Sequence, residues 1–545
     1  MKTCKQCKSP FEITPQDRQF YEMVAVPDPT LCPDCRVQRR MMFRNFFNWY
    51  HRKCDLTGKQ IVSMYDKDAP FPVYEMHEWW SDKWDGKKYG RDVDFSRPFF
   101  EQLKDLSFSV PRMSINNINC ENTDYCNMSV DSRNCYLVFG NVGNEDCYYG
   151  HIVWQSKNCY DCLYVYASRF CYQCVDCVNC YGLAFCTGCD NCSDSGFLVN
   201  CMGCRDCFGC VGLKNKSNYI FNKPYSKEEY DKMMKEFNRG NISHIAMAQK
   251  KVDELVGKEI VKYYHGFNCE NVTGDYLYNC KNIFNSYDLK NCENCSYSAT
   301  LDRFANCQDC NFSSPSNEWS YNSLTTTGHH LLMCHSSINS SDAAYCDNCF
   351  GCKDCFGCVG LKNQQYCVLN KQYSKNEFEA AVPRIIEYMR KTGEWGEFFP
   401  TDMSPFAYNE TIAHEYYPLS KDEAEKRGFR WKKKDENKNY KGPKYQIADA
   451  IRDVPDDICK QILTCEKTEK PYKIIPQELK FYREQNLPVP RLCPDQRFRE
   501  RMNLRNLRRL YDRKCGNCQK PIRTTYASDR PEKVYCEECY LKTVY

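Results

Sequence analysis

A short cysteine period inside a long duplication is the feature of this sequence that most constrains its fold. In the first copy, residues 116–222, the cysteines fall twelve residues apart and then three residues apart. The fifteen residues that begin at Cys201 recur from Cys349, 148 residues later, with two differences. A fixed short period within a duplicated segment is typical of repeat architectures, in which each unit packs on its neighbours. The sequence therefore predicts a mostly β fold built on tandem Cys-ladder β-solenoids, with short helices.

The residues that precede the cysteines indicate how each coil turns. Of the thirty cysteines in the two copies, twelve follow Asn and six follow Asp. Asn and Asp tolerate the left-handed backbone conformation and close turns through their side chains. An Asx-Cys pair therefore predicts a corner, with the Cys pointing into a narrow interior where a small, soft side chain packs well. Because the spacing changes between twelve, nine and three, the register of the coils stays open.

Cysteine usage also bears on the compartment. The chain has 42 cysteines, while its first residues, Met1-Lys-Thr-Cys-Lys, lack the apolar core of a signal peptide. No run approaches the ~20 apolar residues of a membrane span. We therefore expect a cytoplasmic protein with no membrane segment, whose cysteines are thiols or metal thiolates rather than disulfides. A non-classical export route would reverse this expectation. For the solenoid cysteines we favour buried structural thiols, with bound metal and disulfides as the alternatives.

The two ends of the chain are duplicated as well. Residues 4–78 match residues 465–539 at a constant offset of 461, without gaps. Each copy keeps one complete set of four cysteines, and four thiolates are the ligands that tetrahedral zinc prefers. The sets are Cys4, Cys7, Cys32 and Cys35 in the first copy and Cys515, Cys518, Cys536 and Cys539 in the second. The spacing is typical of zinc ribbons, so we predict two structural Zn²⁺ ions per chain.

Each end module also contains a second, degenerate set of ligand positions. The degenerate sets are Cys54, Thr57, Glu75 and Glu78 near the N-terminus and Cys465, Thr468, Cys493 and Gln496 near the C-terminus. Two cysteines rarely hold zinc in a closed structural site, so we expect neither set to bind metal.

A probable helix between the two sets carries arginines at helical spacing. Residues 36–53 place aromatic side chains at i, i+3, i+4 and i+7, and arginines line another face. The arginines are Arg36, Arg40 and Arg44 in the first copy and Arg497, Arg501, Arg505, Arg508 and Arg509 in the second. Such a stripe is either the solvated face of a structural helix or a phosphate-contacting surface. Each solenoid has a net charge of −4, which leaves +12 for the rest of the chain, so a polyanion would bind the ends.

These patterns divide the chain into eight segments. Capping boxes at Ser226–Glu229 and Ser374–Glu377 open helices that we expect to cap the solenoids. The predicted segments are a zinc-ribbon module (1–78), an aromatic connector (79–115), solenoid 1 (116–225), a helical linker (226–265), solenoid 2 (266–373), a capping helix (374–400), a basic linker (401–460) and a second zinc-ribbon module (461–545).

The sequence contains none of the common enzyme fingerprints. It has no phosphate-cradling glycine loop, no nucleophile elbow, no His-Glu-x-x-His and no dinucleotide motif. A cluster of His329, His330, Cys334 and His335 has residue types that bind metal or activate a thiol, but an ordinary surface loop is the favoured interpretation.

Several of these motifs resemble a known family. The Cys-x-x-Cys…Cys-Pro-Asp-Cys start, the Phe-Gly-Cys-Val-Gly-Leu-Lys-Asn repeats, Ser404–Thr411 and Gly428–Trp431 resemble an uncharacterised Cys-rich zinc-ribbon repeat family of small-genome bacteria. Its members often carry an automatic CoA-transferase label, which no nucleotide-binding pattern or catalytic Asp context in this chain supports. The resemblance implies a bacterial, cytoplasmic setting and no activity.

Together these observations predict a non-enzymatic zinc-binding scaffold. Nucleic acid, RNA or DNA, bound through the arginine-rich helices is the favoured ligand. A metal-handling or thiol-redox protein that uses the solenoid cysteines is one alternative, and a scaffold for protein partners is the other. The oligomeric state is left open.

Overall fold

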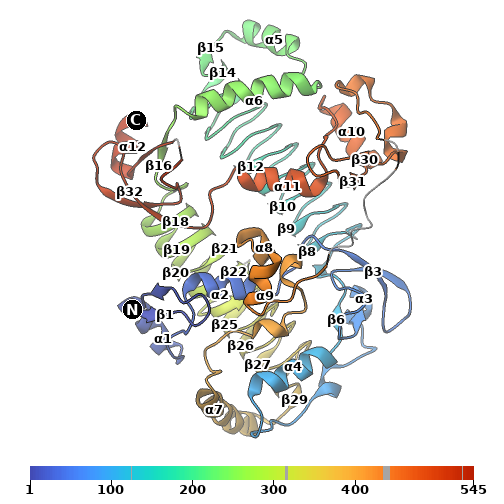
Figure 1. Ribbon diagram of the computed structural model, residues 1–545, viewed down its shortest axis with the longest axis vertical. Helices are drawn as coiled ribbons and strands as arrows, with labels where there is room; N and C mark the ends of the chain where they lie inside the picture. The colour runs from blue at the N-terminus through green and yellow to red at the C-terminus, as the bar shows by residue number, and fades with distance from the viewer. Residues whose placement is uncertain (124, 314–316, 434–441, 443, 531, 545) are drawn as a thin grey trace.

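The computed structural model describes residues 1–545 except 124, 314–316, 434–441, 443, 531 and 545. Figure 1 shows two solenoids, with strands β8 to β12 in one and β18 to β27 in the other, and the helices of the end modules packed against them. The solenoids meet where the Tyr164 hydroxyl lies 3.5 Å from Thr300 Oγ1. The predicted class of fold, tandem β-solenoids with zinc-binding modules at both ends, is confirmed.

Solenoid 1 is a coil of short parallel strands. Its strands are β7 (Asn117–Ile118), β8 (Asn127–Val130), β9 (Phe139–Val142), β10 (His151–Trp154), β11 (Leu163–Tyr166), β12 (Val175–Val178), β13 (Arg205–Phe208), β14 (Ser217–Ile220) and the antiparallel β15 (Lys223–Pro224). The register is constant: His151 pairs with Phe139 on one side and with Leu163 on the other, twelve residues away in each direction.

A left-handed residue at every third position turns the coil. From Met128 to Phe221 the positive-φ positions recur in steps of three, and they include bulky residues such as Phe170 as well as Asn, Asp and Gly. Up to Gly209 the residue after each of them points inward and is buried, as Cys171 and Cys174 show. Each coil therefore has four sides of three residues. Spacings of twelve, nine and three are all multiples of this triplet, which resolves the register and confirms that the cysteines face the interior.

Backbone carbonyls explain why the inward residue is so often Cys. The Cys177 thiol donates to the carbonyl of Val175 at 3.4 Å and lies 3.7 Å from that of Cys186. Ser168 occupies the same kind of position: its hydroxyl donates to Tyr166 O at 2.8 Å and accepts from the Cys180 N–H at 3.1 Å. A small side chain that both donates and accepts therefore suits this position, which Val165 and Leu183 also occupy. No cysteine in the described structure forms a disulfide.

Solenoid 2 follows the same plan with more irregularities. Its strands are β17 (Gly266–Phe267), β18 (Glu270–Tyr278), β19 (Lys281–Lys290), β20 (Glu293–Ser296), β21 (Ala299–Asp302), β22 (Phe304–Ser313), β23 (Asn317–Glu318), β24 (Tyr321–Leu324), β25 (Gly328–Leu332), β26 (Ser340–Ala344), β27 (Lys353–Phe356), β28 (Gln365–Val368) and β29 (Lys371–Gln372). The register shifts between Val272 and Gly274. Tyr321 pairs with Gln308, thirteen residues before it, and with Leu332, eleven residues after it.

Helices pack against the last strands of each solenoid. Helix α5 (Lys227–Glu236) packs against β14, and α7 (Lys375–Thr392) packs against β28. Both begin with capping boxes, at Ser226 and Ser374. Helix α6 (Ile242–Val256) and strand β16 (Ile260–Lys262) then lead into solenoid 2.

The two end modules have matching elements. The N-terminal module contains β1 (Lys2–Thr3), β2 (Pro10–Phe11), α1 (Pro15–Met23), α2 (Pro33–Met41), β3 (Tyr50–Lys53), β4 (Gln60–Ser63), β5 (Val73–Tyr74) and α3 (Met76–Trp80). The C-terminal module contains β30 (Leu463–Thr464), β31 (Pro471–Tyr472), α10 (Pro476–Glu484), α11 (Pro494–Asn503), β32 (Tyr511–Lys514), β33 (Pro521–Thr524), β34 (Lys533–Tyr535) and α12 (Glu537–Val544).

The prediction of one helix over residues 36–53 was wrong in its second half, because α2 ends at Met41. The Asn45 side chain bonds to the backbone of Asn48 and of Met64 and so holds a turn. Of the aromatic residues at helical spacing, Phe43 and Phe46 are buried in this segment, whereas Phe47 and Tyr50 are half-buried. Asn side chains favour such local bonds over a continuing helix.

The remaining segments fill the spaces between modules and solenoids. The connector contains η1 (Gly86–Tyr89), α4 (Phe99–Ser109) and β6 (Arg112–Met113), and the segment after α7 contains η2 (Thr401–Met403), η3 (Tyr408–Glu410), α8 (Ile412–Tyr416), α9 (Lys421–Lys426), η5 (Ile451–Asp453) and η6 (Asp456–Lys460). Helix α8 packs on α2, so residues 401–432 are part of the packed structure rather than a linker. Most of the lysine-rich part, residues 434–441, lies outside the described residues. No helix in the described part of the chain is long and apolar enough to cross a membrane.

Candidate metal centres and the networks that hold them

The N-terminal metal centre is built from a tight turn and a helix N-terminus. Cys4 and Cys7 lie in the turn between β1 and β2, while Cys32 caps α2 and Cys35 lies in its first turn. Their four Sγ atoms lie within 4.8 Å of one another, with Cys7 and Cys32 3.7 Å apart. A Zn–S distance of about 2.3 Å in a tetrahedron places sulfurs about 3.8 Å apart, so the geometry fits zinc. The Cys35 thiol, with smaller contributions from Cys7 and Cys4, lowers the pKa of Cys32 to about 5.

The C-terminal metal centre repeats this construction. Cys515 and Cys518 lie in the turn between β32 and β33, and Cys536 and Cys539 lie at the start of α12. The four Sγ atoms again lie within 4.8 Å of one another, with Cys518 and Cys536 3.7 Å apart. Both tetra-cysteine sets that the sequence predicts are therefore assembled, consistent with two zinc ions. These are the metal-competent groups found among the described residues, and no solenoid cysteine belongs to either.

Hydrogen bonds take the place of metal at the two degenerate sites. The Glu75 backbone N–H donates to Cys54 Sγ at 3.3 Å, and the Glu75 carboxylate caps α3. At the other site Thr468 Oγ1 lies 3.7 Å from Cys493 Sγ. Neither set forms a four-ligand group among the described residues.

Comparison with known proteins agrees with this construction at the N-terminus. Residues 1–43 match the family model described as "Probable treble clef domain". The second pair of ligands in this range, Cys32 and Cys35, lies at the N-terminus of α2. The matched family is thus a treble clef, where the cysteine spacing alone indicated a zinc ribbon. No curated protein matches the chain. The resemblance to the bacterial Cys-rich family therefore stays an expectation.

The arginines of α2 point into solenoid 2 rather than into solvent. Arg36 and Arg40 are at most 4% exposed and both pair with Asp309, at 2.8 and 3.1 Å. Arg40 also donates to Asn311 at 2.7 Å. Arg44 donates to Thr325 Oγ1 at 2.6 Å. The solenoid aspartate thus neutralises two buried guanidinium groups.

The arginines of α11 do the same in solenoid 1. Arg497 and Arg501 pair with Asp161, which is the equivalent of Asp309 at the 148-residue offset. Glu478 joins this network and accepts a hydrogen bond from the Tyr149 hydroxyl at 2.9 Å. Burial raises the pKa of Glu478, although Arg497 acts in the opposite direction.

Two further arginines connect the solenoids to each other. Arg505 pairs with Asp176 of solenoid 1 at 2.9 Å and with Asp288 of solenoid 2. Arg508 donates to Asp288 at 2.7 Å and to the Tyr164 hydroxyl at 2.9 Å. Of the eight arginines predicted to contact nucleic acid, seven are enclosed in this way and Arg509 is exposed. Because these seven arginines are buried, they form neither a phosphate-contacting surface nor a solvated helix face. Both interpretations drawn from the sequence are therefore wrong for them.

Each end module contacts both solenoids, and the two intact metal sites lie next to solenoid 2. Helix α2 packs on β22, while β34 pairs with β16 and β33 packs on β18 at the start of solenoid 2. The degenerate half of the C-terminal module lies against solenoid 1, where Phe481 stacks on Tyr160 at 3.7 Å. In the N-terminal module Asn45 O accepts from Asn127 of solenoid 1 at 2.9 Å, and Trp80 packs on Phe350 of solenoid 2 at 4.7 Å. Each module is therefore attached to both solenoids.

The histidine cluster is not assembled into a site. Cys334 points into the coil, and burial raises the pKa of its thiol well above the ordinary value. His335 is buried and bonds to Asp347 at 2.8 Å, whereas His329 is exposed and His330 faces Asp342 at the surface. The segment forms strand β25 rather than a loop. Among the described residues these four side chains form no metal-competent group.

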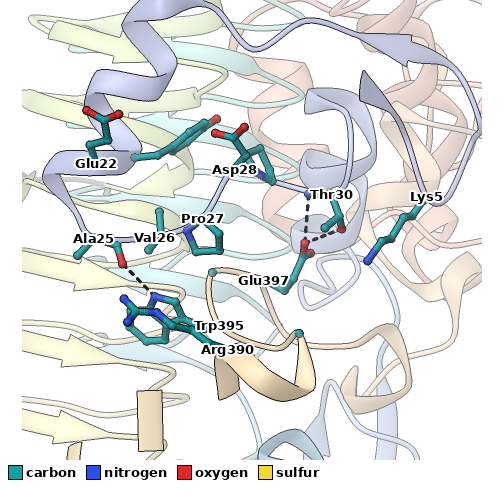
Figure 2. A pocket seen from close by; sticks show the side chains of 14 residues that line it. Lys5, Glu22, Ala25, Val26, Pro27, Asp28, Thr30, Arg390, Trp395 and Glu397 are labelled. Atoms are coloured by element: carbon teal, nitrogen blue, oxygen red, sulfur yellow. Dashed lines mark hydrogen bonds between the residues drawn. The ribbon is translucent and has the colours of Figure 1, made fainter. Parts of the chain in front are cut away.

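A pocket of about 530 Å³ lies beside the N-terminal metal centre. Figure 2 shows Glu397 directed at Thr30, whose backbone N–H donates to it at 3.2 Å, and Trp395 directed at Ala25. The Trp395 indole N–H donates to Ala25 O at 3.0 Å. Arg39 of α2 also pairs with Glu397, at 3.2 Å. These bonds attach the N-terminal module to the segment that follows α7. The residues of the pocket walls, like the buried arginines, therefore hold the module in place.

Proposed function

We propose that this protein is a non-enzymatic scaffold in which two zinc-holding modules fix two solenoids against each other, and that its ligands are proteins rather than nucleic acids. The observation that carries this proposal is the enclosure of seven arginines by solenoid carboxylates and aromatic rings. Buried ion pairs of this kind set the geometry between elements.

Charge supports the same conclusion. The sequence divides into acidic solenoids and basic ends, a division that favours a polyanion at the ends. In the structure Asp161, Asp288 and Asp309 are partners of those basic residues. Part of the positive charge of the ends, that of the enclosed arginines, therefore serves intramolecular pairing rather than contact with phosphate.

The buried thiols do not support the alternative of a metal-handling or redox protein. Nearly all solenoid thiols are buried, and no solenoid cysteine belongs to a metal-competent group among the described residues. The solenoid cysteines already have carbonyl partners in the coil, as Cys177 shows.

Titration with labelled single- and double-stranded RNA and DNA tests the choice of ligand. Binding through phosphate contacts falls linearly in log affinity with log salt, in proportion to the number of contacts. We expect no saturable binding at physiological salt and no change for Arg509→Glu. Saturable binding with a steep salt slope, weakened in Arg509→Glu, would show that the ligand is nucleic acid and that this proposal is wrong.

A further inference from the structure

The duplication makes one half of the molecule a template for the other. Strand β5 pairs with β6 through Val73 and Arg112, and β34 pairs with β16 through Val534 and Val261. Val534 is the equivalent of Val73 at the 461-residue offset. The C-terminal module therefore pairs with the chain just before solenoid 2 in the same way as the N-terminal module pairs with the chain just before solenoid 1. Any surface covered in one half can therefore be compared with its equivalent in the other.

One such surface, on the last coils of solenoid 2, is covered by the chain itself. Phe350 is 6% exposed and packs against Trp79 and Trp80, with ring centroids 5.5 and 4.7 Å apart. Lys362 donates to Trp79 O at 3.0 Å and lies over the Trp84 ring at 5.0 Å. The connector then continues along the end of the solenoid, where the Arg91 N–H donates to Leu369 O at 3.1 Å.

The equivalent surface on solenoid 1 is open. Met202, the counterpart of Phe350, is 39% exposed. A methyl group placed on Gly360 would meet Val110, Trp84 and Trp79, whereas one placed on the equivalent Gly212 would meet Glu259 alone among the described residues. Tyr540, the counterpart of Trp79, lies 5.9 Å from Lys214, the counterpart of Lys362. The space that the Trp84 indole fills beside solenoid 2 is therefore the part that no described residue fills beside solenoid 1.

This open surface forms one wall of a cleft of about 650 Å³ between solenoid 1 and the C-terminal module. Tyr540 and Leu541 of α12, the counterparts of Trp79 and Trp80, line the opposite wall. Four large apolar side chains at 39 to 55% exposure line the cleft: Met202, Phe267, Leu504 and Leu541. Apolar side chains gathered at one cleft, rather than scattered, are typical of an interaction site.

Glu259 adds a charge requirement to the cleft. It replaces Val110 of the other half and lies against Gly212. Asn200 is its hydrogen-bond partner, at 3.5 Å, and no lysine or arginine among the described residues pairs with it. Burial raises the pKa of Glu259 to about 7. A half-buried carboxylate of this kind is stabilised by an incoming cation.

From this comparison we propose that the cleft binds a partner polypeptide segment that presents an aromatic ring, preferably an indole, next to a lysine or arginine. The aromatic ring would occupy the space that Trp84 fills in the other half, and the cation would pair with Glu259. This inference rests on the proposed function, because it supplies the site through which the scaffold holds a protein ligand.

A peptide with the sequence of residues 81–92 is the probe, since it carries Trp84 beside Lys83. We expect the labelled peptide to bind the full-length protein saturably and the same peptide with Trp84→Ala to bind at least about tenfold more weakly, as for an anchor side chain. Met202→Glu in the protein should weaken binding by about tenfold or more, because it places a carboxylate in the apolar wall of the cleft. Glu259→Gln should weaken it by about threefold and flatten its salt dependence.

Met233→Glu is the matched control, because Met233 is 38% exposed on α5 and does not line the cleft. It should leave peptide affinity unchanged. Tyr545, the sequence equivalent of Trp84, lies outside the described residues, so Tyr545→Ala is measured in parallel. Equal or tighter binding by that variant supports the proposal, and loss of binding contradicts it.

Binding of the Trp84→Ala peptide as tight as that of the parent, or equal effects of Met202→Glu and Met233→Glu, would overturn the site. Such a failure is separate from failure of the proposed function, which the nucleic-acid titration decides on its own.

Discussion

The two solenoids descend from one repeat but are held in different ways. Solenoid 1 has seventeen cysteines in residues 116–222 and keeps a register of twelve residues along its strands. Solenoid 2 has thirteen cysteines in residues 266–370, shifts register at Val272/Gly274 and again around Tyr321, and has both intact metal centres beside it. The intact metal sites thus lie next to solenoid 2, the less regular coil. Among the described residues, solenoid 1 has no intact metal site beside it and is held by its continuous ladder of thiols and by packing.

Metal removal at one solenoid is expected to have the largest effect on this comparison. Cys515→Ser should lose one equivalent of zinc, and Cys54→Ser, at the equivalent position of the degenerate site, should lose none. Structural zinc contributes an apparent ~10–16 kcal/mol to the fold that binds it. Hydrogen exchange should therefore rise in β33, β34 and the β16 strand that pairs with β34, while solenoid 1 stays protected.

Elemental analysis and exchange mass spectrometry measure both parts of this prediction. A metal-free preparation in which both end modules stay folded would contradict it. Zinc loss in Cys54→Ser would show instead that a degenerate site still holds metal, and the contrast between the solenoids would disappear.

The aspartates that receive the arginines are expected to have the next largest effects. Asp309→Asn leaves Arg36 and Arg40 without their carboxylate, and Asp161→Asn does the same to Arg497 and Arg501. Breaking one side of a buried ion pair typically costs about 3–5 kcal/mol of unfolding free energy. We expect Asp161→Asn to be the more damaging, because no metal supports the adjacent half-module.

Glu145→Gln is the control for these two variants, since Glu145 forms exposed ion pairs with Arg133 and Lys157. Its cost should be small, because exposed ion pairs contribute little to stability. Denaturant unfolding followed by circular dichroism measures all three. Equal, small losses would mean that the arginine networks do not hold the modules.

Much of this architecture follows from local sequence. Four cysteines in two closely spaced pairs predict each metal centre, and Asx-Cys pairs predict inward thiols. The triplet itself is a weaker signal, because the left-handed positions also hold residues such as Phe170 and Tyr164 that do not favour this conformation. There the interstrand bonds of the coil override the preference of the residue.

Long-range pairing is what the sequence does not reveal. Arg40 and Asp309 are 269 residues apart, and Arg497 and Asp161 are 336 apart. An arginine stripe looks the same whether it faces phosphate or a buried carboxylate. The one sequence signal for this pairing was the opposite net charge of the solenoids and the ends. The basic ends are as complementary to the acidic solenoids as they are to an external polyanion.

A buried charge present in one solenoid and absent from the other yields a pH-dependent prediction. Asp347 in solenoid 2 pairs with Arg112 at 2.9 Å, and the equivalents are Val199 and Val261. Burial alone would raise the pKa of Asp347, but Arg112 and His335 hold it at about 2. A depressed carboxyl pKa contributes stability above the unfolded-state value of about 4, and this stability is lost as pH falls through the folded-state value.

Asp347→Asn should therefore cost about 2 kcal/mol of unfolding free energy near pH 7, and the difference from wild type should shrink as pH falls below about 4. Asp342→Asn, which removes a carboxylate that is 41% exposed beside His330, should show little cost at any pH. Unfolding at several pH values measures this. If the difference in unfolding free energy between the variant and wild type does not change with pH, the Asp347 side chain stabilises the fold through packing and not through its charge.

The smallest effects are expected inside the coils, and they separate packing from metal storage. The Cys207 thiol donates to Arg205 O at 3.3 Å, and Cys355, its equivalent in solenoid 2, donates to Lys353 O at 3.3 Å. Truncation to Ala removes one small buried donor, which costs about 1 kcal/mol at each site. Ser should cost less than Ala, because Ser195 already makes the same bond in solenoid 1, from its hydroxyl to Ser193 O at 2.7 Å. The double variant Cys207→Ala/Cys355→Ala should keep its full metal content, whereas loss of one or more equivalents would make the solenoid thiols a metal store and both coils the functional centre.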